Sequence, residues 1–133
     1  VSSSLIRLAQ ERAPRDVGHG SVEFGVGDML DPRFGRFDYA VAMDSLIHYT
    51  VDEILRALGT LARTTDHAIL FTFAPQTPAL SLMHAAGKLF PRADRAPAIE
   101  PISEAAIRRG VVESPDLHGW RIGRSERISS GFY

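Results

Sequence analysis

The chain has 133 residues, of which 44% are hydrophobic and 23% are charged, with a formal net charge of −1 and a pI near 6.6. This length fits one globular domain or part of one, and the absence of a basic surplus argues against nucleic acid as a partner. Because there is no cysteine, disulfides and thiolate zinc sites are excluded, and we expect a cytoplasmic location. No apolar run reaches the roughly 20 residues of a spanning helix, so any membrane contact is expected to be peripheral.

The first part of the chain predicts a helix followed by a strand. A helix is predicted over residues 2–13. It begins with serines that can cap its amino terminus, its apolar residues lie on one side, and Pro14 ends it. The alternation of Val22, Phe24 and Val26 predicts a short strand whose carboxyl end is marked by Gly27 and Asp28.

The middle of the chain predicts two further strands around a helix. The apolar run 37–43 (FDYAVAM) is typical of a parallel strand covered on both faces, and the run 67–75 (HAILFTFAP) is a third strand. Between them, Thr50 and Glu53 form a capping box at the start of an amphipathic helix. This order indicates an α/β fold with a mostly parallel sheet. The strands at 22–26 and 37–43 are joined by a short turn, so they either pair antiparallel or lie apart in the sheet.

The last part of the chain is less regular. Thr77 caps a predicted helix over 78–90, and a loop rich in proline and arginine follows at 91–103. A second short helix is predicted over 103–114, and a closing strand over 119–133 with a hairpin at Ser130-Gly131.

In an open α/β sheet, ligands bind beyond the carboxyl ends of the strands, which selects residues 27–30, 43–49 and 73–78. Asp28 there could cap a turn or accept a hydrogen bond from a ligand amine. His48 is the most versatile titratable group, because imidazole exchanges protons near neutral pH, although a structural role fits as well. Asp44 and His48 would share a face if residues 44–48 formed one helical turn.

Other site chemistries find less support. The remaining histidines lack the spacing of metal ligands, Ser45 lacks the glycine-flanked turn of a hydrolase nucleophile, and no GxGxxG or phosphate-binding loop occurs. We therefore predict no metal site. Lys88, Arg92 and Arg95 form a basic cluster that is either a solvated loop or a carboxylate-binding rim.

Four stretches resemble one family of enzymes: GDML at 27–30, MDSLIHY at 43–49, FTFAPQTP at 71–78 and SSGFY at 129–133. They are similar to the later part of magnesium-protoporphyrin O-methyltransferases, which use S-adenosylmethionine to methylate a propionate of magnesium-protoporphyrin IX in (bacterio)chlorophyll biosynthesis. Two alternatives stay open. One is a class I methyltransferase for another small molecule such as a quinone, and the other is a non-catalytic porphyrin-binding or scaffold fragment.

The resemblance implies a partial class I methyltransferase (Rossmann-like) fold that lacks the first two strands of the family's sheet, whose order is 3-2-1-4-5-7-6. Residues 1–133 would be the carboxyl-terminal part of one methyltransferase domain, with a substrate-cover insertion at 76–102. In that order the strands at 22–26 and 37–43 are not neighbours. The isolated chain is expected to fold poorly, to be inactive and to bind S-adenosylmethionine weakly or not at all.

The resemblance also implies roles for individual residues. Asp28 would accept the adenine amino group, and His48 would be catalytic as a base, as an orienting group or as an axial magnesium ligand. The implied cofactor-binding residues are Gly27, Asp28, Met29, Met43 and Asp44, and the implied substrate-binding residues are Tyr49, Arg92 and Arg95. Magnesium chelatase and a photosynthetic membrane are the partners that such a function suggests.

Overall fold

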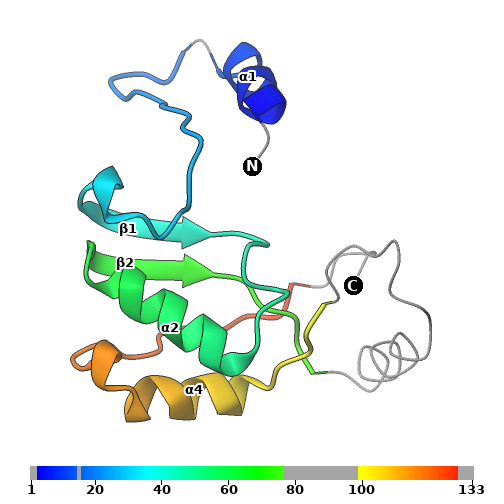
Figure 1. Ribbon diagram of the computed structural model, residues 1–133, viewed down its shortest axis with the longest axis vertical. Coiled ribbons are helices and arrows are strands. Elements are labelled where there is room, and N and C mark those ends of the chain that lie inside the picture. Colours follow the sequence, from blue (N-terminus) through cyan, green and yellow to red (C-terminus); the bar gives the residue numbers. More distant parts are fainter. Residues whose placement is uncertain (1–2, 15, 77–98, 129–133) are drawn as a thin grey trace. The chain divides into compact units, whose positions relative to one another are not determined.

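The computed structural model describes residues 3–14, 16–76 and 99–128. The chain divides into two units, Val1–Phe34 and Gly35–Tyr133, and each is described by itself. Figure 1 shows the elements of both. In the part of the chain that the structure describes, no helix combines the length and the apolar character needed to cross a membrane.

The first unit contains the helix α1 (Ser3–Glu11), which confirms the helix predicted at 2–13, and a short 3-10 helix at Pro32–Phe34. The strand predicted at 22–26 is wrong, because these residues form no strand and Val22 and Val26 are 51% and 56% exposed. Alternating apolar residues suit a strand, but a strand also needs a neighbour for its backbone hydrogen bonds. Residues 22–26 have no such neighbour among the described residues.

The second unit is built on two parallel strands, β1 (Phe37–Ala42) and β2 (Thr65–Phe71), as predicted. Ala40 pairs with Ile69 and Ala42 with Phe71, so both strands end at the same edge of the sheet. The strands lie side by side in Figure 1. Among the described residues the sheet contains these two strands only.

The crossover between these strands is α2 (Val51–Ala62), whose start has the predicted capping box. The Glu53 backbone N–H donates to Thr50 Oγ1 at 3.4 Å, and the Thr50 backbone N–H donates to Glu53 Oε2 at 2.8 Å. Ile54, Ala57, Leu58 and Leu61 are buried, so this helix supplies more of the described core than any other element.

A second helix, α4 (Glu104–Glu113), packs along α2 (Figure 1) and confirms the helix predicted at 103–114. The Ser103 side chain accepts a hydrogen bond from the Ala106 N–H and caps its start, and Ile107 and Val111 are buried beneath it. A 3-10 helix at Pro115–Leu117 follows and also contacts α2.

The expectation that β1 is covered on both faces is wrong for this unit. Ala42 is buried, but Tyr39, Val41 and Leu70 are 60% or more exposed. Burial therefore alternates along the strands, because the described helices cover one face of the sheet only.

The predicted closing strand is not present over residues 119–128, which have neither strand geometry nor a pairing partner in the described ranges. The Ser130-Gly131 hairpin, the helix predicted over 78–90 and the basic cluster of Lys88, Arg92 and Arg95 lie outside the described residues.

Candidate functional site

The turn after β1 carries most of the polar groups that the sequence predicts for the site. Asp44 has a φ of 52°, in the left-handed region that aspartate tolerates better than most residues. Leu46 is fully buried and anchors the turn, and the Tyr49 N–H donates to the Leu46 carbonyl at 3.1 Å. The segment is thus a series of bends rather than one helical turn, so the shared helical face of Asp44 and His48 is wrong.

Thr72, which follows the last residue of β2, holds this turn from the neighbouring strand. Its backbone N–H donates to the Ala42 carbonyl at 3.2 Å, while its Oγ1 accepts the Asp44 N–H at 2.7 Å and donates to Asp44 Oδ1 at 3.3 Å. Thr72 therefore contacts both residues that flank Met43. Thr72 was not among the predicted site residues, because its only sequence signal was a hydroxyl within the strand predicted at 67–75.

The other side chains of the turn differ in what they offer to a ligand. Met43 is 52% exposed and Asp44 and His48 are also exposed, whereas Tyr49 is half-buried. The Ser45 hydroxyl donates to the Met43 carbonyl at 3.0 Å, which gives Ser45 a local structural role. Met43, Asp44 and His48 are therefore exposed candidates for ligand contacts at the carboxyl end of β1.

A third segment, residues 99–103, lies against both strand ends. The Ile102 N–H donates to the Ala74 carbonyl and the Gln76 N–H donates to the Ile102 carbonyl, both at 2.9 Å. The Glu100 N–H donates to the Ile47 carbonyl at 3.0 Å. Three segments that are distant in the sequence thus meet at the edge where ligands of α/β sheets bind.

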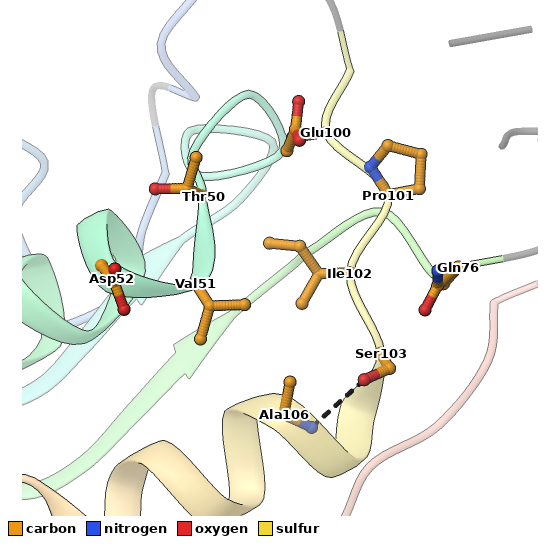
Figure 2. A pocket seen from close by; sticks show the side chains of 9 residues that line it. All are labelled: Thr50, Val51, Asp52, Gln76, Glu100, Pro101, Ile102, Ser103 and Ala106. Carbon is orange, nitrogen blue, oxygen red and sulfur yellow. Dashed lines mark hydrogen bonds between the residues drawn. The ribbon is translucent and has the colours of Figure 1, made fainter. Parts of the chain in front are cut away.

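A cavity of about 370 Å³ lies beside these contacts, between the first turn of α2 and the start of α4. Figure 2 shows Val51 and Ile102 facing each other across it. The Thr50 and Ser103 side chains cap the two helices and therefore already bind backbone N–H groups. The complete lining consists of Thr50, Val51, Asp52, Gln76, Glu100, Pro101, Ile102, Ser103 and Ala106.

The first unit contains the remaining cofactor candidates of the described chain. Asp28 caps a turn, since the Leu30 N–H donates to its Oδ1 at 2.9 Å, and the turn interpretation of this residue is therefore confirmed. A Cβ on Gly27 would lie 2.8 Å from Phe34 Cζ, so glycine at 27 lets that ring pack against the backbone. Met29 is 39% exposed. Gly27, Asp28 and Met29 thus form one described group, and Met43 and Asp44 form another in the second unit.

A carboxylate with a lowered pKa follows this turn. The side chain and the backbone N–H of Arg33 donate hydrogen bonds to Asp31, and they hold the pKa of the Asp31 carboxyl below its ordinary value. Asp31 and Arg33 therefore stabilise the 3-10 helix at Pro32–Phe34, and we assign them no ligand.

Residues 42–133 match the family described as magnesium-protoporphyrin IX methyltransferase C-terminus. The chain belongs to this family. The chain is similar to the magnesium-protoporphyrin O-methyltransferase of Rhodobacter capsulatus, with 41% identity over 133 residues. The alignment covers all of this chain and 56% of that relative. The magnesium protoporphyrin IX methyltransferase of Arabidopsis thaliana is 26% identical over 134 residues, and the chain covers 41% of it.

A solved structure shares the fold of this chain. The crystal structure of magnesium protoporphyrin IX methyltransferase from Synechocystis PCC 6803 with bound SAH matches with a TM-score of 0.69 and 27% identity. The match covers 96% of this chain and 55% of that chain, so the chain spans about half the length of the relatives it matches. The expected partial methyltransferase fold is confirmed.

Proposed function

We propose that this chain is the carboxyl-terminal part of an S-adenosylmethionine-dependent O-methyltransferase. Its acceptor is a propionate carboxylate of magnesium-protoporphyrin IX, and the reaction belongs to (bacterio)chlorophyll biosynthesis. The observation that carries the proposal is the family match over residues 42–133, together with 41% identity along the whole chain to a relative named for this reaction. The SAH in the Synechocystis structure supports S-adenosylmethionine as the methyl donor, because SAH is the product of its demethylation.

The chemistry of the available groups fits this cofactor. When bound, S-adenosylmethionine supplies a methyl group on a positively charged sulfur. Asp28 uses Oδ1 for its turn, and its Oδ2 accepts no hydrogen bond from the described residues, so it is available to an adenine amino group. The exposed Asp44 carboxylate suits a cationic neighbour. We assign Gly27, Asp28 and Met29 to the adenine side, and Met43 and Asp44 to the sulfur side.

The acceptor side needs orientation more than a strong base. A propionate is ionised at neutral pH and is then already a nucleophile, so most of the acceleration should come from holding it in line with the methyl group. His48 is exposed four residues after Asp44, in the turn that ends β1, and we assign it the catalytic role of orienting that carboxylate. Tyr49, Arg92 and Arg95 are assigned to the porphyrin, because arginine pairs well with a second propionate.

A hybrid enzyme tests this function. In the hybrid, the amino-terminal part of the Rhodobacter capsulatus relative is joined to this chain at the residue aligned with Val1. We expect the hybrid to transfer label from methyl-labelled S-adenosylmethionine to magnesium-protoporphyrin IX. It should leave the dimethyl ester of that porphyrin unlabelled, because the ester has no carboxylate. The full-length Rhodobacter enzyme is the positive control.

Two outcomes would contradict the proposal. A hybrid that binds S-adenosylmethionine but methylates a quinone and not the porphyrin would favour another small-molecule methyltransferase. A hybrid that binds the porphyrin but transfers no methyl group would favour a binding or scaffold role.

We further propose magnesium chelatase as a partner, and a cytoplasmic location with peripheral contact to the photosynthetic membrane. A flat apolar porphyrin partitions into lipid, which supports the membrane contact. Direct transfer from the protein that makes the porphyrin would keep it out of water, which supports the contact with magnesium chelatase. Co-sedimentation of the hybrid with lipid vesicles, and its co-purification with magnesium chelatase, test the two contacts separately.

A further inference from the structure

We propose that Thr72 is a positioning residue for the methyl-donor site, and that its hydroxyl holds the turn of Met43 and Asp44 in the geometry that receives the cofactor. The inference rests on the proposed function, because it assigns a role within the same site. Thr72 does not need to contact the cofactor. It acts through Asp44.

The geometry shows a reciprocal pair of hydrogen bonds. Thr72 Oγ1 accepts the Asp44 N–H at 2.7 Å and donates its own hydrogen to Asp44 Oδ1 at 3.3 Å. The Thr72 backbone N–H donates to the Ala42 carbonyl at 3.2 Å. The residue that follows β2 thus holds the residues before and after Met43, and it lies 28 positions from Asp44 in the sequence.

Asp44 needs such support because its φ of 52° is uncommon for a residue with a side chain. Conformations of this kind persist where the surrounding structure determines them. Leu46 anchors the far end of the turn by full burial, but nothing else in the described residues holds the Asp44 N–H. Threonine suits the task because its β-branched side chain has a stiff χ1 angle.

The consequence concerns the two groups assigned to the sulfur side. Without the hydroxyl, the Asp44 N–H would turn toward water, and the backbone could relax out of the left-handed region. The Asp44 carboxylate and the Met43 carbonyl would then leave their positions at the end of β1. The loss should therefore appear in cofactor affinity and turnover, while the porphyrin contacts are preserved.

The test uses Thr72→Val in the hybrid, since valine keeps the shape and removes the hydroxyl. Calorimetric titration should show about tenfold weaker binding of S-adenosylmethionine, the size expected for one lost hydrogen bond to a charged group. We expect kcat to fall by about the same factor and KM for the porphyrin to stay within about twofold. Thr72→Ser restores the hydroxyl and should recover most of the affinity.

Thr60→Val is the matched control, because the Thr60 hydroxyl donates to the Arg56 carbonyl and accepts from Arg63 Nη2, and neither contact involves the turn of Met43 and Asp44. This substitution also replaces a hydroxyl by a methyl group, but away from the site. The Thr60→Val hybrid should therefore bind S-adenosylmethionine like the unmodified hybrid. A purely structural role for Thr72 would lower the melting temperature without changing affinity at temperatures below melting. If Thr72→Val prevents folding, Thr72→Ala takes its place with the same expected results.

Asp44→Gly provides an independent check, because glycine adopts the left-handed turn without help. In that background Thr72→Val should weaken cofactor binding by less than about twofold. Unchanged affinity in Thr72→Val alone, a Thr72→Ser variant as weak as Thr72→Val, or a full tenfold loss in the Asp44→Gly background would each overturn the inference. A hybrid that binds S-adenosylmethionine without methylating the porphyrin would refute the proposed function, while its affinities would still decide the role of Thr72.

Discussion

Gly110 marks the closest approach of α4 to α2, and its replacement by alanine should destabilise the fold even though alanine favours helix. A Cβ at position 110 would lie 2.4 Å from Leu55 Cδ1, 3.1 Å from Cδ2 and 3.2 Å from Cγ. The first distance is too short for a real contact and the other two are tight, so the Leu55 side chain must shift away from α4.

Two opposing terms set the size of the effect. Alanine is favoured over glycine in a helix interior by about 1 kcal/mol. Overpacking at a close contact costs about 1–3 kcal/mol. Leu55 is half-buried and can move partly toward solvent, so we take the middle of that range. The net result for Gly110→Ala is a loss of about 1 kcal/mol in the free energy of unfolding.

A double-mutant cycle separates these terms, with urea unfolding of the hybrid as the assay. In a Leu55→Ala background the clash is gone, so Gly110→Ala should now stabilise the protein by about 1 kcal/mol. The sign of the substitution therefore reverses between the two backgrounds. If Gly110→Ala has the same effect in both backgrounds, or stabilises the protein with Leu55 present, then Gly110 is not required for the close packing of α4 on α2.

Hydrogen bonds from the backbone N–H and the hydroxyl of Thr50 hold the pKa of Glu53 below its ordinary value. Ionised Glu53 therefore stabilises the start of α2 when the pH is above the ordinary pKa. This contribution is lost as the pH falls through the lowered pKa. Glu53→Gln keeps an acceptor for the cap without titrating, so its unfolding free energy should change less than that of the unmodified hybrid below about pH 4.5; equal acid sensitivity would contradict this origin. His48→Ala should lower kcat by about tenfold or more and leave S-adenosylmethionine affinity within about twofold, as measured by initial rates and calorimetry, and an equal loss of affinity would place His48 against the cofactor instead. Arg92→Ala should raise the porphyrin KM, and an unchanged KM would remove Arg92 from the substrate site. The isolated chain should bind S-adenosylmethionine weakly, and a calorimetric titration showing micromolar binding would contradict that expectation.

Local signals in the sequence were sufficient for the elements that carry their own stabilising contacts. Thr50 and Glu53 specify the start of α2 by hydrogen bonds within four residues, and Ser103 does the same for α4. The strands at 37–42 and 65–71 are also recoverable, because their apolar runs are bounded by polar turns. The carboxyl end of β1 as the proposed place of the site rests on this order of elements.

Features that depend on distant partners could not be predicted in this way. The alternation of Val22, Phe24 and Val26 is strand-like, yet these residues form no strand because pairing requires a neighbour that no local pattern reveals. Thr72 lies 28 positions from Asp44, and nothing in either segment indicates that their side chains meet. The contact of Ile102 with Ala74 and Gln76 was unpredictable for the same reason.

The hydrogen bonds of Ile102 with Ala74 and Gln76 join the two ends of the segment between residues 76 and 102. Because the entropy of closing a loop grows only with the logarithm of its length, each doubling of that segment costs only about 0.6 kcal/mol. Insertions or deletions between residues 76 and 102 should therefore weaken the hydrogen bonds of Ile102 with Ala74 and Gln76 only slightly.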